Sequence, residues 1–134
     1  MNIHLVYIGK PRNADANRLA AEYARRITRF CRFDMIEAKD EKSAGRYPKA
    51  VSVVLDPEGP MMSSQELAAF LERNSGEIAF FVGGADGFSD AFRQGADRLL
   101  SLSKMTLPHE LARVVLTEQI YRAFTILSGH PYPR

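Results

Sequence analysis

The chain lacks the features that would mark it as a secreted, membrane-spanning or metal-binding protein. Its 134 residues include a single cysteine, Cys31, so an internal disulfide and a cysteine-paired metal site are both excluded. No apolar run approaches the length of a membrane-spanning helix. The apolar segment 3–8 is too short for the core of a signal peptide. We therefore expect a cytosolic protein that needs neither a membrane nor a metal.

Net charge is also small, but it is unevenly distributed along the chain. The total of +2 does not by itself indicate nucleic-acid binding. The segment 10–32 nevertheless carries seven basic residues against two acidic ones, a net +5, which leaves the rest at −3. If the helix expected in this segment reaches Arg32, four arginines share one of its faces: Arg18, Arg25, Arg29 and Arg32. Such a face fits RNA contact and a merely solvated surface equally well.

Strand-like and helix-like segments alternate along the sequence. Short apolar runs predict five buried strands, at 3–8, 33–38, 51–55, 78–82 and 98–102. Amphipathic patterns predict four helices, at 16–30, 63–73, 89–95 and 110–127, with Ser63 and Glu66 as a capping box for the second. The polar segment 39–50 contains glycine and proline and is expected to be a loop. The alternation predicts one α/β domain, 1–134, with a mostly parallel sheet flanked by helices.

Two of the expected helices carry informative apolar surfaces. The helix at 16–30 has one apolar stripe, made of Leu19, Tyr23, Ile27 and Phe30. The helix at 110–127 is apolar on more than one side, so the sheet can cover only part of it. In so short a chain the favoured second cover is another subunit, and a helix buried entirely within one chain is the alternative.

Three loops follow strands whose carboxyl ends should meet at one edge of the sheet. They are LDPEG at 55–59, GGADG at 83–87 and LSKMTLPH at 102–109. This edge is the usual ligand crevice of a parallel sheet, and glycines let backbone N–H groups approach a ligand. The dinucleotide motif G-x-G-x-x-G and the P-loop Gly-Lys-Ser/Thr are both absent, and GGADG alone also fits a plain tight turn. Backbone groups with apolar walls suit an adenine ring and a thioether chain better than a phosphate-rich ligand.

The same loops carry a resemblance to a known family. The segments LDPEG, FFVGGADGFS and LSLSKMTLPHELARVVLTEQIYRAFTILSGHPYPR strongly resemble those of the SPOUT methyltransferases that modify large-subunit ribosomal RNA, in particular the pseudouridine N3-methyltransferase type. The N-terminal MNIHLVYIGK and EYARRI are similar as well, so the resemblance covers nearly the whole chain. Its most specific part is 82–132, which combines S-L-S-x-M-T-L-P-H with E-Q-I-Y-R-A.

The resemblance implies a fold, a cofactor and a partner. The fold is an α/β SPOUT fold with a C-terminal deep trefoil knot, and the active site of a homodimer is built at the subunit interface. The cofactor is S-adenosyl-L-methionine, and the target is N3 of a pseudouridine of 23S ribosomal RNA. The net charge of only +2 favours a structured target, the assembled ribosome, over free RNA as the substrate. Carried over by position, the cofactor pocket uses Leu55, Gly84, Ser103, Lys104, Met105, Thr106, Leu107 and Pro108. Many of these contacts should come from the backbone.

Three residues near the C-terminus are the expected catalytic groups. The sulfonium methyl group is already activated, so the protein must align a ring nitrogen with it and help to remove the N–H proton. Arg122, Tyr132 and Arg134 are expected to grip or polarise the target base or its phosphate. Alternatively, Arg122 pairs with Glu118 at i, i+4, and Tyr132 packs over the edge of the sheet.

The chain departs from the family pattern in two places. Segment 39–50 is short where the family usually has an additional helical stretch between the second and third strands. The tail ends Tyr132-Pro133-Arg134 where the family has Tyr-His-Arg or Tyr-His-Lys, and proline can neither transfer a proton nor donate a hydrogen bond. The alternative is therefore a catalytically silent relative that binds RNA or ribosomes. A third possibility, a plain nucleotide-binding domain, rests on the glycine turn alone.

Overall fold

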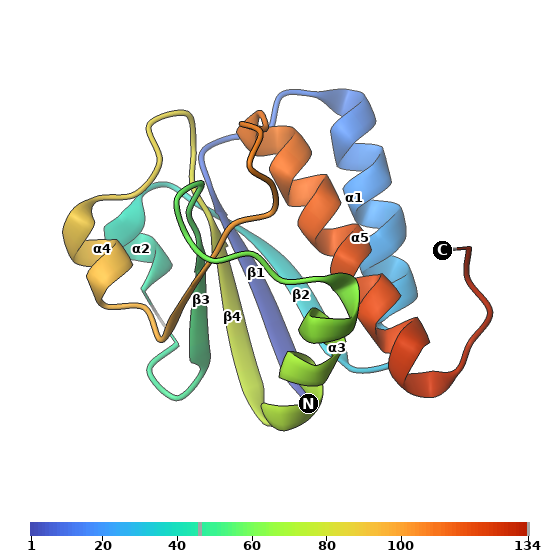
Figure 1. Ribbon diagram of the computed structural model, residues 1–134. Helices are drawn as coiled ribbons and strands as arrows, with labels where there is room; N and C mark the ends of the chain where they lie inside the picture. The colour runs from blue at the N-terminus through green and yellow to red at the C-terminus, as the bar shows by residue number, and fades with distance from the viewer. Residues whose placement is uncertain (46, 134) are drawn as a thin grey trace.

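Five parallel strands form one sheet in the order β2-β1-β4-β3-β5 (Figure 1). The structure, a computed structural model, describes residues 1–45 and 47–133. The strands are β1 (Asn2–Ile8), β2 (Arg32–Ala38), β3 (Val51–Leu55), β4 (Glu77–Val82) and β5 (Arg98–Leu100). The predicted α/β class and the parallel sheet are confirmed, and the trefoil knot stays a prediction.

The two faces of the sheet are covered very differently. On one face lie α1 (Ala14–Ile27), α3 (Ser64–Arg73) and α5 (His109–Ser128). Within the described residues, the other face carries only two short helices, α2 (Glu41–Ala44) and α4 (Asp90–Gln94). The alternation of side chains along β1 serves both faces, because Ile3 and Leu5 enter the first core while Val6 enters the second.

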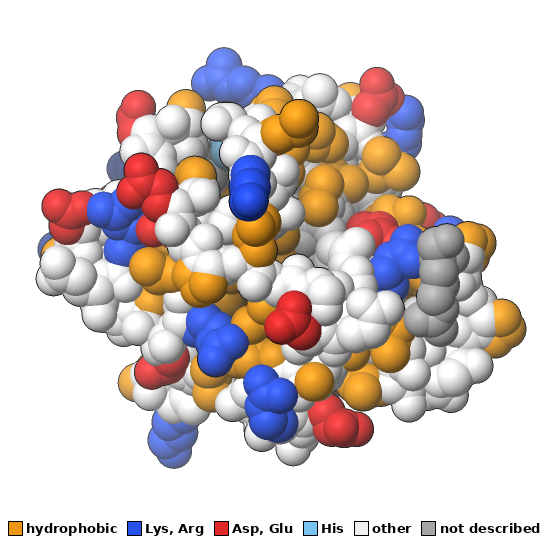
Figure 2. Space-filling view, in the orientation of Figure 1, with side chains coloured by type: hydrophobic (Ala, Val, Ile, Leu, Met, Phe, Trp, Pro, Cys, Tyr) orange, Lys and Arg blue, Asp and Glu red, His pale blue; other side chains and the backbone are white. Residues whose placement is uncertain are grey.

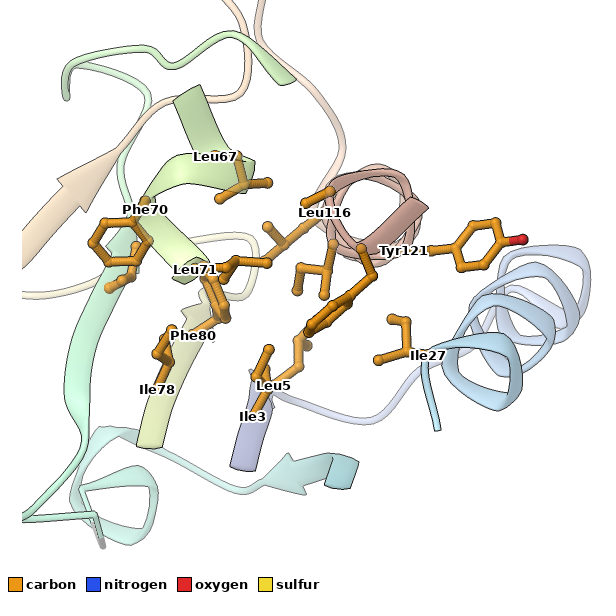
Figure 3. Packing of buried hydrophobic residues seen from close by; sticks show 14 of the residues in the cluster. Ile3, Leu5, Ile27, Leu67, Phe70, Leu71, Ile78, Phe80, Leu116 and Tyr121 are labelled. Atoms are coloured by element: carbon orange, nitrogen blue, oxygen red, sulfur yellow. The ribbon is translucent and has the colours of Figure 1, made fainter. Parts of the chain in front are cut away.

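The larger core lies between the sheet and α1, α3 and α5. Figure 3 shows Leu71 of α3, Leu116 of α5 and Ile27 of α1 converging on the side chains of β1 and β4. All three are fully buried, and each such side chain contributes about 1.5–3 kcal/mol through the hydrophobic effect. Contacts with α1 and α3 also cover much of α5 within one chain, but Leu111 and Leu127 stay 45% and 39% exposed.

Helix α1 ends earlier than its sequence pattern predicts. It stops at Ile27, where the Thr28 hydroxyl donates to the carbonyl oxygen of Arg25 (2.5 Å) and the chain turns into β2. Residues 29 to 32 therefore lie outside the helix, and the predicted arginine face extending to Arg32 is wrong. Leu19, expected on the apolar stripe of this helix, is 51% exposed.

Two further segments differ from their predicted structure. The loop expected at 39–50 contains α2, which forms because Asp40 and Ser43 make a reciprocal capping box. Strand β5 ends at Leu100 rather than at residue 102, and beyond it Ser101 makes an isolated parallel bridge with Met61, in which the Ser101 N–H donates to the Pro60 carbonyl oxygen (2.9 Å). Among the described residues, no helix combines the length and apolar character that crossing a membrane requires.

Candidate functional site

A cavity of about 550 Å³ lies at the carboxyl edge of the sheet. Its walls come from the three loops that the sequence places at this edge: those after β3 and β4, and the one between β5 and α5 (Figure 1). This volume is typical of small-molecule sites. Seven of the eight predicted cofactor-pocket residues line it: Leu55, Gly84, Ser103, Met105, Thr106, Leu107 and Pro108. Lys104 does not line it.

The glycine turn after β4 forms the back of the cavity. At Gly83 an added Cβ atom would come within 3.2 Å of the Gly87 Cα atom and of the Phe88 ring, so a larger residue there would need its neighbours to move by a few tenths of an ångström. Gly87 has φ +68°, a conformation that glycine adopts most easily. At Gly84 the nearest atom to an added Cβ is the Ile8 carbonyl oxygen at 3.5 Å, an ordinary contact. Packing therefore does not demand glycine at 84, a residue that lines the cavity.

The short helix α2 holds the far end of this turn. The backbone N–H and the hydroxyl of Ser89, the N-cap of α4, donate to the two carboxylate oxygens of Glu41 (2.5 and 2.8 Å). Phe88, which lines the cavity, stacks on Phe92 of α4 with ring centroids 4.6 Å apart. The segment predicted to be a loop thus supports one wall of the cavity. No local sequence signal connects Glu41 with a residue 48 positions away.

Asp56 supplies the carboxylate in the cavity wall, and the sequence patterns did not single it out. It is 7% exposed, accepts a hydrogen bond from the Glu58 N–H (3.1 Å) and lies 3.7 Å from the Arg93 guanidinium. Among the described lining residues it is the only acidic one. Apolar walls, backbone groups and one carboxylate fit a cationic adenosyl cofactor. The available signal was its place in LDPEG, directly after Leu55.

The loop before α5 is shaped by its own serines. The Ser101 hydroxyl donates to the Ser103 carbonyl oxygen (2.9 Å), and the Ser103 hydroxyl oxygen accepts from the Met105 N–H (2.9 Å). Pro108, the N-cap of α5, gives no side-chain cap, so the positive end of the helix dipole is left open beside the cavity. Figure 2 shows hydrophobic side chains gathered over this loop and the start of α5; Met105 is 79% exposed.

The first turn of α5 also holds loop 9–13 next to the cavity. One oxygen of the Glu110 carboxylate accepts the N–H groups of Arg12 (2.8 Å) and Asn13 (2.9 Å). The bonds from Asn13 and Arg12 lower the pKa of Glu110 from its ordinary value. Arg113, which is 4% exposed, donates to the Asn17 side chain. These contacts join α5 to the start of α1.

Two of the predicted catalytic residues, Arg122 and Tyr132, form a separate cluster with Glu118 on the C-terminal side of α5. Glu118 accepts from Arg122 (2.9 Å) and from the Tyr132 hydroxyl (2.8 Å), and the Arg122 guanidinium lies 4.6 Å from the centre of the Tyr132 ring. Arg122 also donates to the Pro133 carbonyl oxygen (2.6 Å). Burial raises the pKa of Tyr132, and the neighbouring Tyr23 and Glu118 raise it further.

This Glu118–Arg122–Tyr132 cluster does not touch the cavity of its own chain. The last cavity residue on α5 is Ala112, and Arg122 lies ten residues further along, roughly 15 Å at 1.5 Å per residue. The alternative that Arg122 pairs with Glu118 is confirmed, whereas the catalytic roles of Arg122 and Tyr132 stay predictions. Arg134 lies outside the described residues. Across residues 1–45 and 47–133, no three His, Cys, Asp or Glu side chains are grouped to hold a metal ion.

Comparisons with solved structures agree with this fold. A probable methylase family protein from Haemophilus influenzae Rd KW20 superposes with a TM-score of 0.66 at 13% identity, over 98% of this chain and 72% of the other. The SpoU methyltransferase AviRb from Streptomyces viridochromogenes, solved in complex with the cofactor AdoMet, gives a TM-score of 0.52 at 11% identity, over 96% and 61%. At such identities the likeness shows a shared fold.

Sequence comparisons are closer and cover the whole chain. Ribosomal RNA large subunit methyltransferase H from Solibacter usitatus is 42% identical over 139 residues, covering 100% of both chains. The protein of the same name from Thermus thermophilus is 45% identical over 138 residues, covering 100% of this chain and 99% of the other. The family described as "Predicted SPOUT methyltransferase" matches residues 1–133. Together these matches show that the chain belongs to the SPOUT methyltransferase family.

Proposed function

We propose that this protein transfers a methyl group from S-adenosyl-L-methionine to 23S ribosomal RNA, at N3 of a pseudouridine in the assembled ribosome. The observation that carries the proposal is the cavity at the carboxyl edge, which gathers seven of the eight residues expected to hold the cofactor. The names of the two full-length relatives support ribosomal RNA of the large subunit as the substrate. Such a substrate also favours a cytoplasmic location.

The cavity residues have distinct tasks in this proposal. When bound, the cofactor supplies a methyl group that its sulfonium has already activated. Leu55 and Leu107 provide apolar walls for the adenine ring, and backbone groups of segment 103–108 provide its hydrogen-bond partners. The carboxylate of Asp56, whose charge Arg93 balances in part from 3.7 Å, favours a cationic over an anionic ligand at this wall. The protein then acts mainly by alignment, because a nucleophilic nitrogen must lie in line with the methyl group.

The proposal requires a homodimer. In a single chain the Glu118–Arg122–Tyr132 cluster lies further along α5 than the residues that line the cavity, and none of its members lines it. We infer that the cluster and the tail of one subunit complete the cavity of the other. Exposed Leu111, Leu127 and Met105 supply apolar surface for such an interface. There Arg122, Tyr132 and Arg134 would grip the target base or its phosphate.

Methyl transfer to ribosomes tests the enzyme. We expect radiolabel from S-adenosyl-L-methionine to enter 23S RNA of ribosomes purified from a strain that lacks this protein, at a single pseudouridine located by mass spectrometry. A complete absence of transfer, with ribosomes of the source organism, would contradict the proposed activity.

A silent relative is the second candidate, and Pro133 is the observation that favours it. In this structure the carbonyl oxygen of Pro133 accepts from Arg122, a contact that any residue at 133 could supply. Calorimetry distinguishes the candidates at the cofactor step. A protein that binds ribosomes but neither binds S-adenosyl-L-methionine nor transfers its methyl group would be the silent relative.

A further inference from the structure

The basic residues between 10 and 32 fall into two groups with different electrostatic surroundings. On α1, Arg18 pairs with Asp15, while Arg25 and Arg26 share Glu22 (2.7 and 2.8 Å). These pairs neutralise much of the helix surface. An arginine whose charge is already balanced gains less from a phosphate than an unpaired one.

Loop 9–13 contains the contrasting group. Lys10 and Arg12 are exposed, and within residues 1–45 and 47–133 neither side chain takes part in an ion pair or a hydrogen bond. The carboxylate of Glu110 contacts this loop through the backbone N–H groups of Arg12 and Asn13 and not through the two cationic side chains. Two cations on this loop are thus available to an external anion.

The loop is held in place although its side chains are free. Glu110 fixes the backbone at Arg12 and Asn13 through one carboxylate oxygen, and Gly9 takes φ +92° where the chain leaves β1. Proline at 11 further restricts the backbone. A binding loop that is already ordered loses less conformational entropy when it meets its partner.

The loop lies on the rim of the proposed cofactor cavity. A small cleft lined by Gly9, Lys10 and Pro11 shares Val82, Gly83 and His109 with the cavity. Figure 1 shows the β1–α1 connection at the same end of the molecule as the start of α5 and the turn after β4. A nucleotide whose base enters the cavity therefore brings its flanking phosphates towards Lys10 and Arg12.

We propose that loop 9–13 is a phosphate clamp for the RNA substrate, in which Lys10 and Arg12 contact phosphates that flank the target nucleotide. Glu110 is a positioning residue, because it holds the clamp against the helix that borders the cofactor cavity. The inference rests on the proposed function. It moves the expected RNA contact from the arginines of α1 to a loop beside the site of chemistry.

Two double variants of equal charge test the clamp. Lys10→Ala/Arg12→Ala removes two unpaired cations, and Arg18→Ala/Arg25→Ala removes two paired ones. We expect the first to raise the Kd for ribosomes about 10- to 100-fold at physiological salt. The slope of log affinity against log salt should fall by about 1.4–1.8, since each phosphate contact contributes about 0.7–0.9. The control should stay within about twofold of wild type, and the cofactor Kd should change in neither.

The positioning role of Glu110 has a separate readout. In Glu110→Gln, we expect faster amide exchange at Arg12 and Asn13, a several-fold higher KM for ribosomes, and an unchanged cofactor Kd. A purely structural role would change the exchange rates and leave this KM unaltered.

Equal losses in the two double variants, or no loss in the first, would overturn the clamp. Failure of the clamp is separable from failure of the proposed function. Ribosome binding is measured directly, by filtration across a salt series, and it reports on Lys10 and Arg12 even if no methyl group is transferred.

Discussion

The two edges of the sheet use opposite kinds of chemistry. At the carboxyl edge, three loops surround a cavity with apolar side chains and backbone groups, and Asp56 is the one acidic residue among its described lining. At the amino edge, polar side chains bind one another: the ring nitrogens of His4 lie 2.7 Å from Asp34 and 2.7 Å from Glu77. The difference teaches that the edge with the cavity presents mostly apolar and backbone surface to a ligand, whereas the other edge pairs charged side chains with one another.

Helix α5 connects these two environments. It begins at the cavity without a side-chain cap, and its far half carries the Glu118–Arg122–Tyr132 cluster, in which each side chain has a partner. Within a single chain, these contacts give the cluster a structural role. The proposed dimer gives it a second role, because it would meet the open edge of another copy.

The largest expected effect comes from a variant that tests whether the Glu118–Arg122–Tyr132 cluster acts in catalysis as well as in structure. In Arg122→Ala we expect kcat for ribosome methylation to fall about 10²- to 10³-fold, the usual cost of losing one group that stabilises developing charge. The Kd for S-adenosyl-L-methionine should stay within about threefold, since Arg122 does not line the cavity of its own chain. Arg26→Ala, which removes another i, i+4 partner of a glutamate, is the matched control. An unchanged kcat in Arg122→Ala would make the cluster structural only.

The second prediction concerns the cavity at the carboxyl edge of the sheet. Gly84→Val should fold normally, because the nearest atom to an added Cβ is at 3.5 Å, and it adds a branched side chain to a residue that lines the cavity. We expect the cofactor Kd to rise about 100-fold, or about 2.7 kcal/mol, measured by calorimetry. Gly76→Val is the control, since a Cβ there meets nothing within 4 Å and Gly76 precedes β4 at the amino edge. Equal cofactor affinity in the two variants would mean that the cavity is not the cofactor site.

The third prediction concerns the contribution of the Glu118–Arg122–Tyr132 cluster to stability. Glu118→Gln removes the charge that holds both Arg122 and Tyr132, in a pair whose side chains are only 17% and 22% exposed. We expect the free energy of unfolding to fall by about 1–2 kcal/mol in urea denaturation, as for other hydrogen bonds to charged groups. Glu22→Gln, whose arginine partners lie on the exposed face of α1, should change stability less. If Glu22→Gln proved the more destabilising, the cluster would not be a stabilising network.

The loops at the carboxyl edge of the sheet were easier to predict from the sequence than the side-chain contacts that support them. Apolar runs predicted the strands, and the parallel-sheet rule then brought LDPEG, GGADG and LSKMTLPH to one edge. Such signals are local, because each run or turn is read from neighbouring residues. The supports of the cavity are not local. Glu41 and Ser89 are 48 residues apart in the sequence, and Glu110 and Arg12 are 98 residues apart. A periodic pattern of apolar residues carries no information about contacts between such distant residues.

The end of α1 shows a different limit of sequence reasoning. Apolar periodicity continues to Phe30, yet the helix ends at Ile27 because the chain must turn to pair β2 with β1. Tertiary pairing overrides helical pattern here, and it removes Arg29 and Arg32 from the predicted face. The strand order β2-β1-β4-β3-β5 was likewise beyond the sequence, since it depends on which crossovers pack best.

The smallest expected effect is a pH dependence at the amino edge. Burial lowers the pKa of His4, but the hydrogen bonds and charges of Glu77 and Asp34 outweigh it, so the pKa lies above the ordinary 6.5. A histidine with a raised folded-state pKa stabilises the protein fully below the unfolded-state value, and this contribution is lost as pH rises through the folded-state value. Unfolding in urea at pH 6 and pH 8 should therefore show a loss of stability that His4→Gln removes.

The side chains around His4 determine whether the amino edge of the sheet carries a histidine cation. His4 stacks on Tyr47 (4.2 Å) from the loop after α2, and Asp34 and Glu77 face it from β2 and β4, so its cation is enclosed by groups that favour it. The control is His130→Gln, which removes an exposed histidine and leaves the contacts of His4 with Asp34 and Glu77 in place. A histidine resonance that titrates below 6.5 in folded protein, assigned to His4 by NMR, would show that burial wins over the two carboxylates. The amino edge would then hold a neutral imidazole, and its polar groups would be matched by hydrogen bonding rather than by charge.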